Sequence, residues 1–72
     1  MFPKKAVQSL IGNKVQIEMK GDNAVLEGVL KSVDDYMNIH LENTVEIVNG
    51  ERKRVLGSVV LRGNNIIIIN PV

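Results

Sequence analysis

The sequence predicts a mostly β-structure fold in which a short N-terminal helix precedes five antiparallel strands. Apolar and polar residues alternate through most of the chain, which is typical of half-buried strands. Segments rich in Gly and Asn separate these stretches at intervals of roughly ten residues. Helical spacing of apolar residues is confined to residues 3–11. Strands spaced in this way favour a small barrel or a sandwich.

Segment 3–11 is the predicted helix. Pro3 suits a first helical turn, where its missing N–H is not needed. The apolar residues that share one face at helical spacing are Val7, Leu10 and Ile11. Gly12 followed by Asn13 is typical of a helix C-terminus. A helix this short is stable only when it packs against another element.

Segments 14–20 and 24–33 are predicted to form the first hairpin. Apolar and polar residues alternate cleanly in segment 14–20, and residues 21–23 supply a tight turn. Gly28 lies in the middle of the second segment, where a glycine often marks a bulge or a sharp bend. A bent strand is what a small barrel needs to turn its corner.

Segments 37–48, 52–61 and 66–70 are the three remaining predicted strands. Asn49-Gly50 is a strong signal for a two-residue hairpin turn. Gly57 is a second expected bend. The whole chain, residues 1–72, is therefore predicted to form one domain.

Composition limits how such a small domain can be stabilised. A chain of 72 residues buries only about 60% of the surface that its unfolded form exposes. It contains no Cys and only one His, which excludes disulfides, thiolate metal sites and His-rich metal sites. No cofactor is expected. Oligomerisation is the route that remains.

The C-terminal strands point to the same conclusion. Segment 66–69 is apolar on both faces, and segment 59–61 is nearly so. Exposed edges of this kind are aggregation templates unless a partner covers them. Another copy of the chain is the economical partner. If the last strand of one copy pairs with the fourth strand of the next, the head-to-tail contact closes into a ring where the rotation permits.

Charge and hydropathy restrict the partners and the location. The net charge of +1 does not indicate a nucleic-acid-binding protein, so any RNA site must be confined to a small part of the surface. No segment approaches the roughly 20 apolar residues that span a bilayer. Residues 1–5 lack the apolar core of a signal peptide. The protein is expected to be soluble and cytoplasmic, with no membrane partner.

Two polar segments between the strands carry the candidate binding residues. They are Asp34-Asp35-Tyr36-Met37-Asn38 and Arg62-Gly63-Asn64-Asn65. Together they supply a carboxylate, an aromatic ring, an amide and a guanidinium, which suit the clamping of one flat nucleobase. The aromatic ring and the guanidinium can stack on the base, and the amide offers a donor beside an acceptor.

Each candidate also has a purely structural interpretation. Tyr36 could pack beside its own loop, and Arg62 could guard a strand edge. Asn38 and Asn64 could be turn residues that satisfy their own backbone. Asp34 could initiate a turn in the same way.

Catalysis and metal binding have little support. Asp34 and Asp35 are adjacent and diverge in an extended chain, which argues against a pair of catalytic acids. His40 and Glu42 share a strand face with Asn38, but two ligands are too few for a metal site. The chain is not expected to be an enzyme.

The two polar segments, with the strands around them, resemble the two motifs of the Sm/LSm family. The first motif is similar to VLEGVL at 25–30 and VDDYMNIHL at 33–41, and the second to LGSVVLRGNNI at 56–66. The short connection at Asn49-Gly50 resembles archaeal members. The resemblance implies an N-terminal helix on a strongly bent, five-stranded, partly open barrel. It also implies a ring of six or seven subunits, with the heptamer favoured.

The resemblance further implies that U-rich single-stranded RNA binds at the inner rim of the ring, in RNA processing or turnover. A ring that acts as a structural scaffold, with incidental RNA binding, is the alternative. By position, Asn38 would read the base edge and Asp34 would orient Asn38. Tyr36 and Arg62 would stack on the two faces of the base.

The resemblance also covers Gly63 and Asn64, whereas Lys4 and Lys5 are candidates only by their place on the predicted helix. Gly63 and Asn64 complete the RNA site, although the family often has Asp where this chain has Asn64. Lys4 and Lys5, near the start of the predicted helix, are candidates for a secondary contact with RNA on the face of the ring. More often such lysines form a solvated helix surface.

Overall fold

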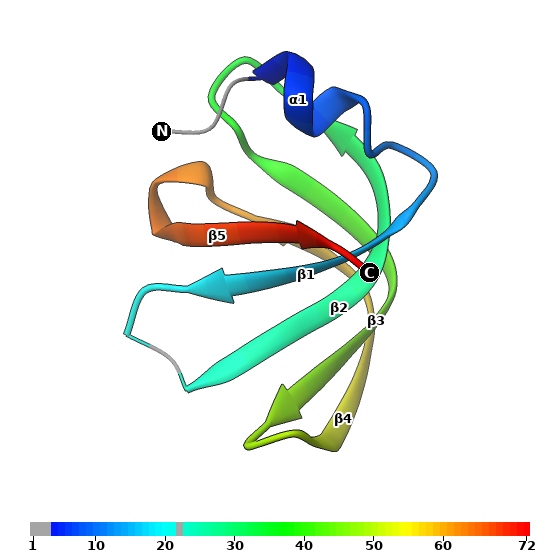
Figure 1. Ribbon diagram of the computed structural model, residues 1–72, viewed down its shortest axis with the longest axis vertical. Coiled ribbons are helices and arrows are strands. Elements are labelled where there is room, and N and C mark those ends of the chain that lie inside the picture. The colour runs from blue at the N-terminus through cyan, green and yellow to red at the C-terminus, as the bar shows by residue number, and fades with distance from the viewer. Residues whose placement is uncertain (1–3, 22) are drawn as a thin grey trace.

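A computed structural model describes residues 4–21 and 23–72 of the chain. One helix precedes five strands, as predicted (Figure 1), and the elements are α1 (Lys4–Gln8), β1 (Lys14–Met19), β2 (Ala24–Val33), β3 (Ile39–Val48), β4 (Glu51–Leu61), a 3-10 helix η1 (Gly63–Asn65) and β5 (Ile66–Pro71). Pro3, the predicted first residue of the helix, lies outside the described residues. Among those residues, no helix is long and apolar enough to cross a membrane.

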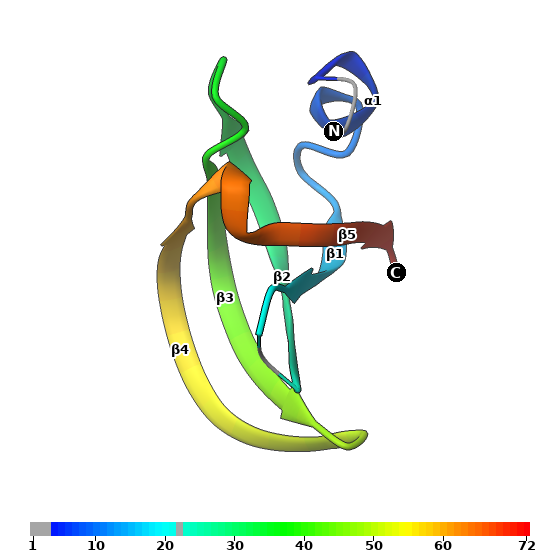
Figure 2. The ribbon, with the colours of Figure 1, turned by 90° about the vertical axis from the view of Figure 1, so that its left-hand side faces the viewer.

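The five strands form one antiparallel sheet in the order β4-β3-β2-β1-β5. The strands β2, β3 and β4 are long and curve together, whereas β1 and β5 run across the bend (Figure 2). Because β4 and β5 stand at opposite ends of this order, the barrel is only partly closed. The helix α1 lies at one end of the sheet, beside the loop that joins β2 and β3 (Figure 1).

The core is built from strand positions that alternate with exposed ones. Its fully buried side chains belong to Val15, Ile17, Leu30, Ile39 and Leu41. Val7 of α1 packs into the same cluster, so the short helix gains the partner that its length requires. The period-two pattern of the sequence is confirmed in β1, where every second residue in its first half is buried.

Two glycines bend the long strands, as predicted. The pairing of β2 with β3 shifts register at Gly28, where an added Cβ would lie 2.8 Å from Thr44 Oγ1 and 2.9 Å from the Glu42 carbonyl oxygen. Only glycine fits where the strands approach so closely. Gly57 has a φ of +72°, a backbone conformation that residues with a Cβ rarely adopt. The register of β3 with β4 shifts beside it.

The helix is shorter than predicted, because α1 ends at Gln8 rather than at Ile11. Beyond this point the amides bond three residues back, as the Leu10 N–H does at 2.9 Å. Gly12 has a φ of +91°, and its N–H donates to the Leu30 carbonyl oxygen at 2.8 Å. This hydrogen bond ties the segment to β2 and prevents a further helical turn.

The third strand begins at Ile39 rather than at Met37. Met37 has a φ of +63°, a left-handed conformation that a strand does not contain. Its N–H donates to the Asp34 carbonyl oxygen at 3.0 Å and closes a turn. Smaller differences occur at three other ends, since β1 ends at Met19, β4 begins at Glu51 and β5 reaches Pro71.

The unguarded apolar segments lie on the two outermost strands of the sheet. Val60 of β4 is 72% exposed, and Ile67 of β5 is 50% exposed. Both strands also have one hydrogen-bonding edge that the strand order leaves without a neighbour. Backbone edges and apolar side chains in this arrangement match the requirements of a β-strand partner.

Candidate nucleic-acid interface

The two predicted binding segments meet at one end of the sheet. The first forms the turn between β2 and β3, in which the Asp34 N–H also donates to the Asn38 carbonyl oxygen at 3.1 Å. The second contains η1 and lies against this turn through Gly63. An added Cβ at Gly63 would lie 2.7 Å from the Met37 carbonyl oxygen and would also collide with that of Tyr36. The absence of a side chain at Gly63 therefore allows the two loops to touch.

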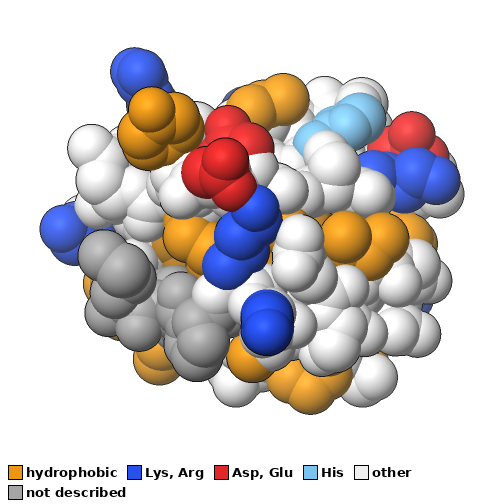
Figure 3. Space-filling model, turned by 90° about the horizontal axis from the view of Figure 1, so that it is seen from above, with side chains coloured by type: hydrophobic (Ala, Val, Ile, Leu, Met, Phe, Trp, Pro, Cys, Tyr) orange, Lys and Arg blue, Asp and Glu red, His pale blue; other side chains and the backbone are white. Residues whose placement is uncertain are grey.

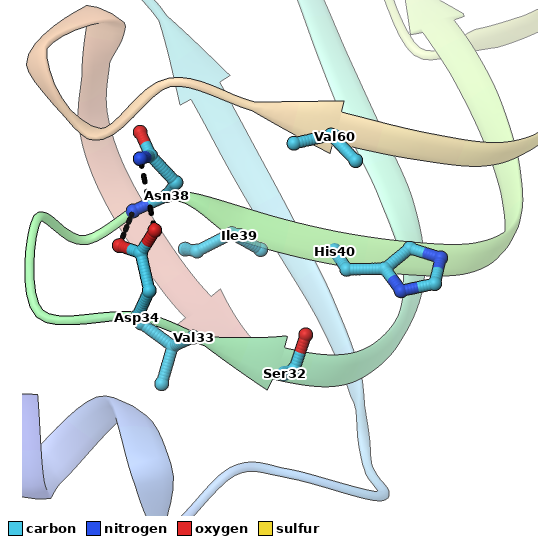
Figure 4. Close-up of a pocket in the computed structure, with 7 residues that line it drawn as sticks. All are labelled: Ser32, Val33, Asp34, Asn38, Ile39, His40 and Val60. Atoms are coloured by element: carbon cyan, nitrogen blue, oxygen red, sulfur yellow. Dashed lines mark hydrogen bonds between the residues drawn. The ribbon is translucent and has the colours of Figure 1, made fainter.

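The carboxylate of Asp34 organises the first loop. Its Oδ1 accepts hydrogen bonds from the backbone N–H groups of Tyr36 at 2.8 Å and Asn38 at 2.9 Å. Its Oδ2 accepts a third from Asn38 Nδ2 at 3.0 Å (Figure 4). The backbone N–H of Asn38, followed by its side-chain amide, holds the pKa of Asp34 below its ordinary value. Asp34 is thus both the turn residue and the partner of Asn38 that the sequence suggested.

The side-chain amide of Asn38 is held at both ends. Asn38 Nδ2 donates to Asp34, and Asn38 Oδ1 accepts the backbone N–H of Gly63 at 3.1 Å. A carboxylate can only accept hydrogen bonds and a backbone N–H can only donate one, so only one orientation of the amide satisfies both partners. One N–H and one lone pair of Asn38 remain for a ligand. We refer to these bonds as the Asp34–Asn38–Gly63 network.

The bond from Gly63 is a feature that the sequence analysis missed. The sequence contained a partial signal, since a glycine in a polar loop often marks a close backbone approach. Nothing in the sequence indicated which group in the other loop would accept the Gly63 N–H. The two segments are 25 residues apart in the chain at this bond.

Two shallow depressions flank the network. The tyrosine depression, of about 560 Å³, is lined by Lys20, Asp35, Tyr36, Met37, Gly63, Asn64, Ile66 and Ile67. The histidine depression, of about 360 Å³, is lined by Ser32, Val33, Asp34, Asn38, Ile39, His40 and Val60 (Figure 4). The structure therefore brings Tyr36, Gly63 and Asn64 into one depression and places Asp34 and Asn38 in its neighbour.

The aromatic ring of Tyr36 is available for stacking. The side chain is 83% exposed, which excludes the interpretation that Tyr36 is packed beside its loop. Lys20 is an additional residue of the tyrosine depression that the sequence analysis did not identify. Its backbone N–H donates to the Asn65 carbonyl oxygen at 2.7 Å, which fixes the end of β1 beside the second loop.

The predicted cations are more scattered than the predicted network. Arg62 is exposed and lines neither depression. Lys4 forms an ion pair with Asp35, so its ammonium group already has a partner within the protein. Lys5 is exposed on α1. The end of the molecule that carries α1 shows charges of both signs side by side rather than one basic patch (Figure 3).

Asp34, Asp35 and His40 each bind a different partner within the protein. They are therefore not arranged as a metal site or as a catalytic pair. Asp34 binds within its own loop and Asp35 binds Lys4, so the two carboxylates act separately. His40 Nε2 and Ser58 Oγ share a hydrogen bond of 2.6 Å. In residues 4–21 and 23–72, no group of three or more His, Cys, Asp or Glu could hold a metal ion.

Comparison with known proteins gives consistent matches over nearly the whole chain. A model of the LSM domain family matches residues 5–71. An Sm-like protein of Archaeoglobus fulgidus is 45% identical with a TM-score of 0.90, covering 99% of this chain and 95% of that one. The Sm protein of Pyrococcus abyssii, solved in complex with a uridine heptamer, is 25% identical with a TM-score of 0.90 and full coverage of both chains. The SmAP1 heptamer of P. aerophilum is 31% identical with a TM-score of 0.86, covering 100% of this chain and 97% of that one.

Proposed function

This chain belongs to the Sm/LSm family, and on that basis we propose that it forms a homo-oligomeric ring that binds U-rich single-stranded RNA. The heptamer is favoured over the hexamer, and the RNA binds at the inner rim of the ring. The bound RNA is presented for processing or turnover. The protein acts by binding, without catalytic chemistry of its own.

The Asp34–Asn38–Gly63 network is the observation that carries the proposal for RNA. Uracil presents an acceptor, O4, beside a donor, N3–H. After its internal hydrogen bonds, Asn38 retains one N–H and one lone pair in a fixed order. This order suits uracil, whereas cytosine presents a donor and an acceptor in the reverse order.

Stacking is the second component of the proposed contact with the base. The exposed ring of Tyr36 lies beside the network and can cover one face of a base, a contact that contributes about 1–3 kcal/mol. Arg62, at the start of the second loop, covers the other face and keeps its charge near phosphate. Gly63 and Asn64 line the depression in which Tyr36 lies. Lys5 remains a candidate for a secondary contact, while Lys4 would first have to leave Asp35.

The proposed ring is supported by the edge strands and by the relatives. The strands β4 and β5 carry exposed apolar side chains and end the strand order. A related protein from P. aerophilum is a heptamer, and one from Pyrococcus abyssii has been solved with a uridine heptamer. In a ring, one weak pocket per subunit is repeated around the pore. A single RNA strand that occupies several pockets therefore binds more tightly than any one pocket would.

Oligouridine titrations of two Tyr36 variants test this function. Tyr36→Ala should lower the affinity of each pocket by about 1–3 kcal/mol, because the stacking surface is lost. The control, Tyr36→Phe, keeps the aromatic face and should bind within a few-fold of the wild type. Native mass spectrometry of both variants establishes that the assembly is intact. Equal oligouridine binding by all three proteins would contradict the RNA site and favour the scaffold alternative.

A further inference from the structure

A second surface extends from the proposed RNA site along β2, β3 and β4, and its far part has no role in that site so far. The histidine depression shares Asp34 and Asn38 with the network but extends along the strands to His40 and Val60 (Figure 4). Its volume of about 360 Å³ lies within the range of small-ligand pockets, which is about 300–1,000 Å³. The tyrosine depression lies on the other side of the same network through Gly63.

The spacing of the two surfaces suits consecutive nucleotides. Asn38 and His40 are two residues apart on one face, which places them about 6.6 Å apart along an extended chain. Successive bases in a stacked strand are only about 3.4 Å apart. A base beside His40 would therefore be unstacked from a base at Asn38, as is usual where proteins recognise single-stranded RNA.

The depression has the groups that a nucleoside requires. The imidazole ring of His40 is held by Ser58 Oγ at 2.6 Å, so its plane is oriented before any ligand arrives. Ser32 pairs with His40 in the β2–β3 ladder, and its exposed hydroxyl lies at the other wall. Val60 pairs with His40 from β4 and adds an apolar surface that is 72% exposed. A flat ring, an apolar floor and a hydroxyl can receive a base and a ribose.

The proposed ring seam and this surface involve different parts of β4. A neighbouring subunit that pairs with β4 bonds to the backbone edge of the strand, in the plane of the sheet. The side chains of Ser32, His40 and Val60 are neighbours in one cross-strand row and stand roughly perpendicular to that plane. The proposed seam and the histidine depression therefore use different directions around β4.

We propose that the histidine depression binds a second nucleotide of the same RNA strand, so that each subunit holds two nucleotides. The inference rests on the proposed RNA-binding function. The base stacks on His40 and Val60, and the ribose 2′-hydroxyl bonds to Ser32. Because stacking accepts any base, this second position tolerates all four bases, whereas the position at Asn38 prefers uracil.

The composition of the chain supplies a reporter for each position. Tyr and His each occur once, so the aromatic NMR signals of Tyr36 and His40 are unique. The intact wild-type assembly is titrated with uridine monophosphate while both sets of signals are followed. A mononucleotide is used because it cannot bridge the pockets of neighbouring subunits. Both signals should shift, each with its own saturation curve.

Three matched variants separate the positions. In Tyr36→Ala the His40 signals should still shift, and in His40→Ala the Tyr36 signals should still shift. Adenosine monophosphate should move the His40 signals about as strongly as uridine monophosphate does. Replacing the ribose by deoxyribose should lower the affinity reported by the His40 signals about fivefold or more in the wild type. It should not lower this affinity in Ser32→Ala, which already lacks the Ser32 hydroxyl.

The outcomes distinguish this inference from the function on which it rests. His40 signals that stay fixed while those of Tyr36 shift would overturn the second position and leave the RNA function intact. A His40 shift that disappears in Tyr36→Ala would show that it is an indirect effect of the first site, and would also overturn the inference. Tyr36 signals that do not respond to any nucleotide would instead contradict the proposed function.

Discussion

The binding loops and the edge strands differ in how far one chain completes them. The loops at 34–38 and 62–65 are joined by internal hydrogen bonds, and the Asn38 amide already has one orientation. The edges of β4 and β5 instead leave apolar side chains and backbone groups exposed. The geometry of the proposed RNA site is therefore set within a subunit, whereas its affinity should depend on assembly. Changes in the two regions should therefore have separable effects.

The largest expected effect comes from breaking an edge. Ile68→Lys places a charge in the proposed seam of β5 without altering either depression, so the ring should dissociate and the avidity of linked pockets should be lost. Affinity for a long oligouridine should fall by about 100-fold or more, as measured by titration alongside size-exclusion chromatography. Gln8→Lys adds the same charge on exposed α1 and should keep both the ring and the affinity. Undiminished RNA binding by a dissociated Ile68→Lys chain would show that assembly is not needed.

The contact between the two loops should be the most sensitive point of the binding region. In Gly63→Ala the new methyl group collides with the Tyr36 and Met37 carbonyl oxygens. The second loop must then move away, and Asn38 loses the Gly63 N–H. Because one partner that orients Asn38 is lost, at about 1–3 kcal/mol for a polar group left unpaired, oligouridine affinity should fall roughly tenfold. A ring of unchanged mass in native mass spectrometry, with wild-type RNA binding, would mean that the loops need not touch.

Arg62 tests the electrostatic part of the site. Arg62→Ala should weaken oligouridine binding and also reduce its dependence on salt, because one cation near phosphate is lost. The slope of log affinity against log salt should fall by about one unit for each contact that is lost. Titrations at several salt concentrations measure it. An unchanged slope would place Arg62 away from the RNA backbone.

A smaller effect is expected for base choice. Asp34→Asn introduces a second amide, which can pair with Asn38 in either orientation, so only Gly63 then opposes a flip of Asn38. The ratio of oligouridine to oligocytidine affinity should decrease several-fold, and by more than the overall affinity does. Asp35→Asn is the matched control, since Asp35 pairs with Lys4 rather than Asn38, and it should keep the ratio. Equal ratios in both variants would place the reading of the base edge elsewhere.

The smallest effect concerns stability at acid pH. The pKa of Asp34 is lowered in the folded protein from the ordinary value of 3.8, mainly by the Asn38 backbone N–H. The stabilisation is therefore complete above 3.8 and is lost as the pH falls through the lower pKa of the folded state. The decrease in thermal midpoint on acidification should be shallower in Asp34→Asn. An equally steep decrease in that variant would show that Asp34 does not contribute to it.

The elements that depend on local sequence signals could be predicted from the sequence alone. Alternation predicted the strands, and the glycines at 28 and 57 predicted the bends. The predicted end of the helix was wrong because the hydrogen bond from Gly12 to Leu30 on β2 determines where the helix stops. No local sequence pattern indicates that Leu30 is the partner of Gly12. The start of β3 was wrong because Met37 adopts a left-handed conformation that its side chain disfavours.

The site shows the same limit. The contact between Asp34 and Asn38 was anticipated from the resemblance to the first Sm/LSm motif, and the structure contains it within a single turn. The Gly63 bond and the place of Lys20 depend on how β1 and the second loop meet in space. The division of the site into two depressions was likewise absent from the sequence, because it follows from the side chains of three adjacent strands.

Native mass spectrometry of the wild-type chain with a heptauridine reports assembly and RNA binding in one measurement. We expect a closed ring of identical subunits, with seven favoured, that carries the RNA, and no RNA on any dissociated subunit at the same concentration. A monomer that binds the RNA as tightly as the ring would show that binding does not need assembly, and a ring that carries no RNA would contradict the proposed RNA-binding function.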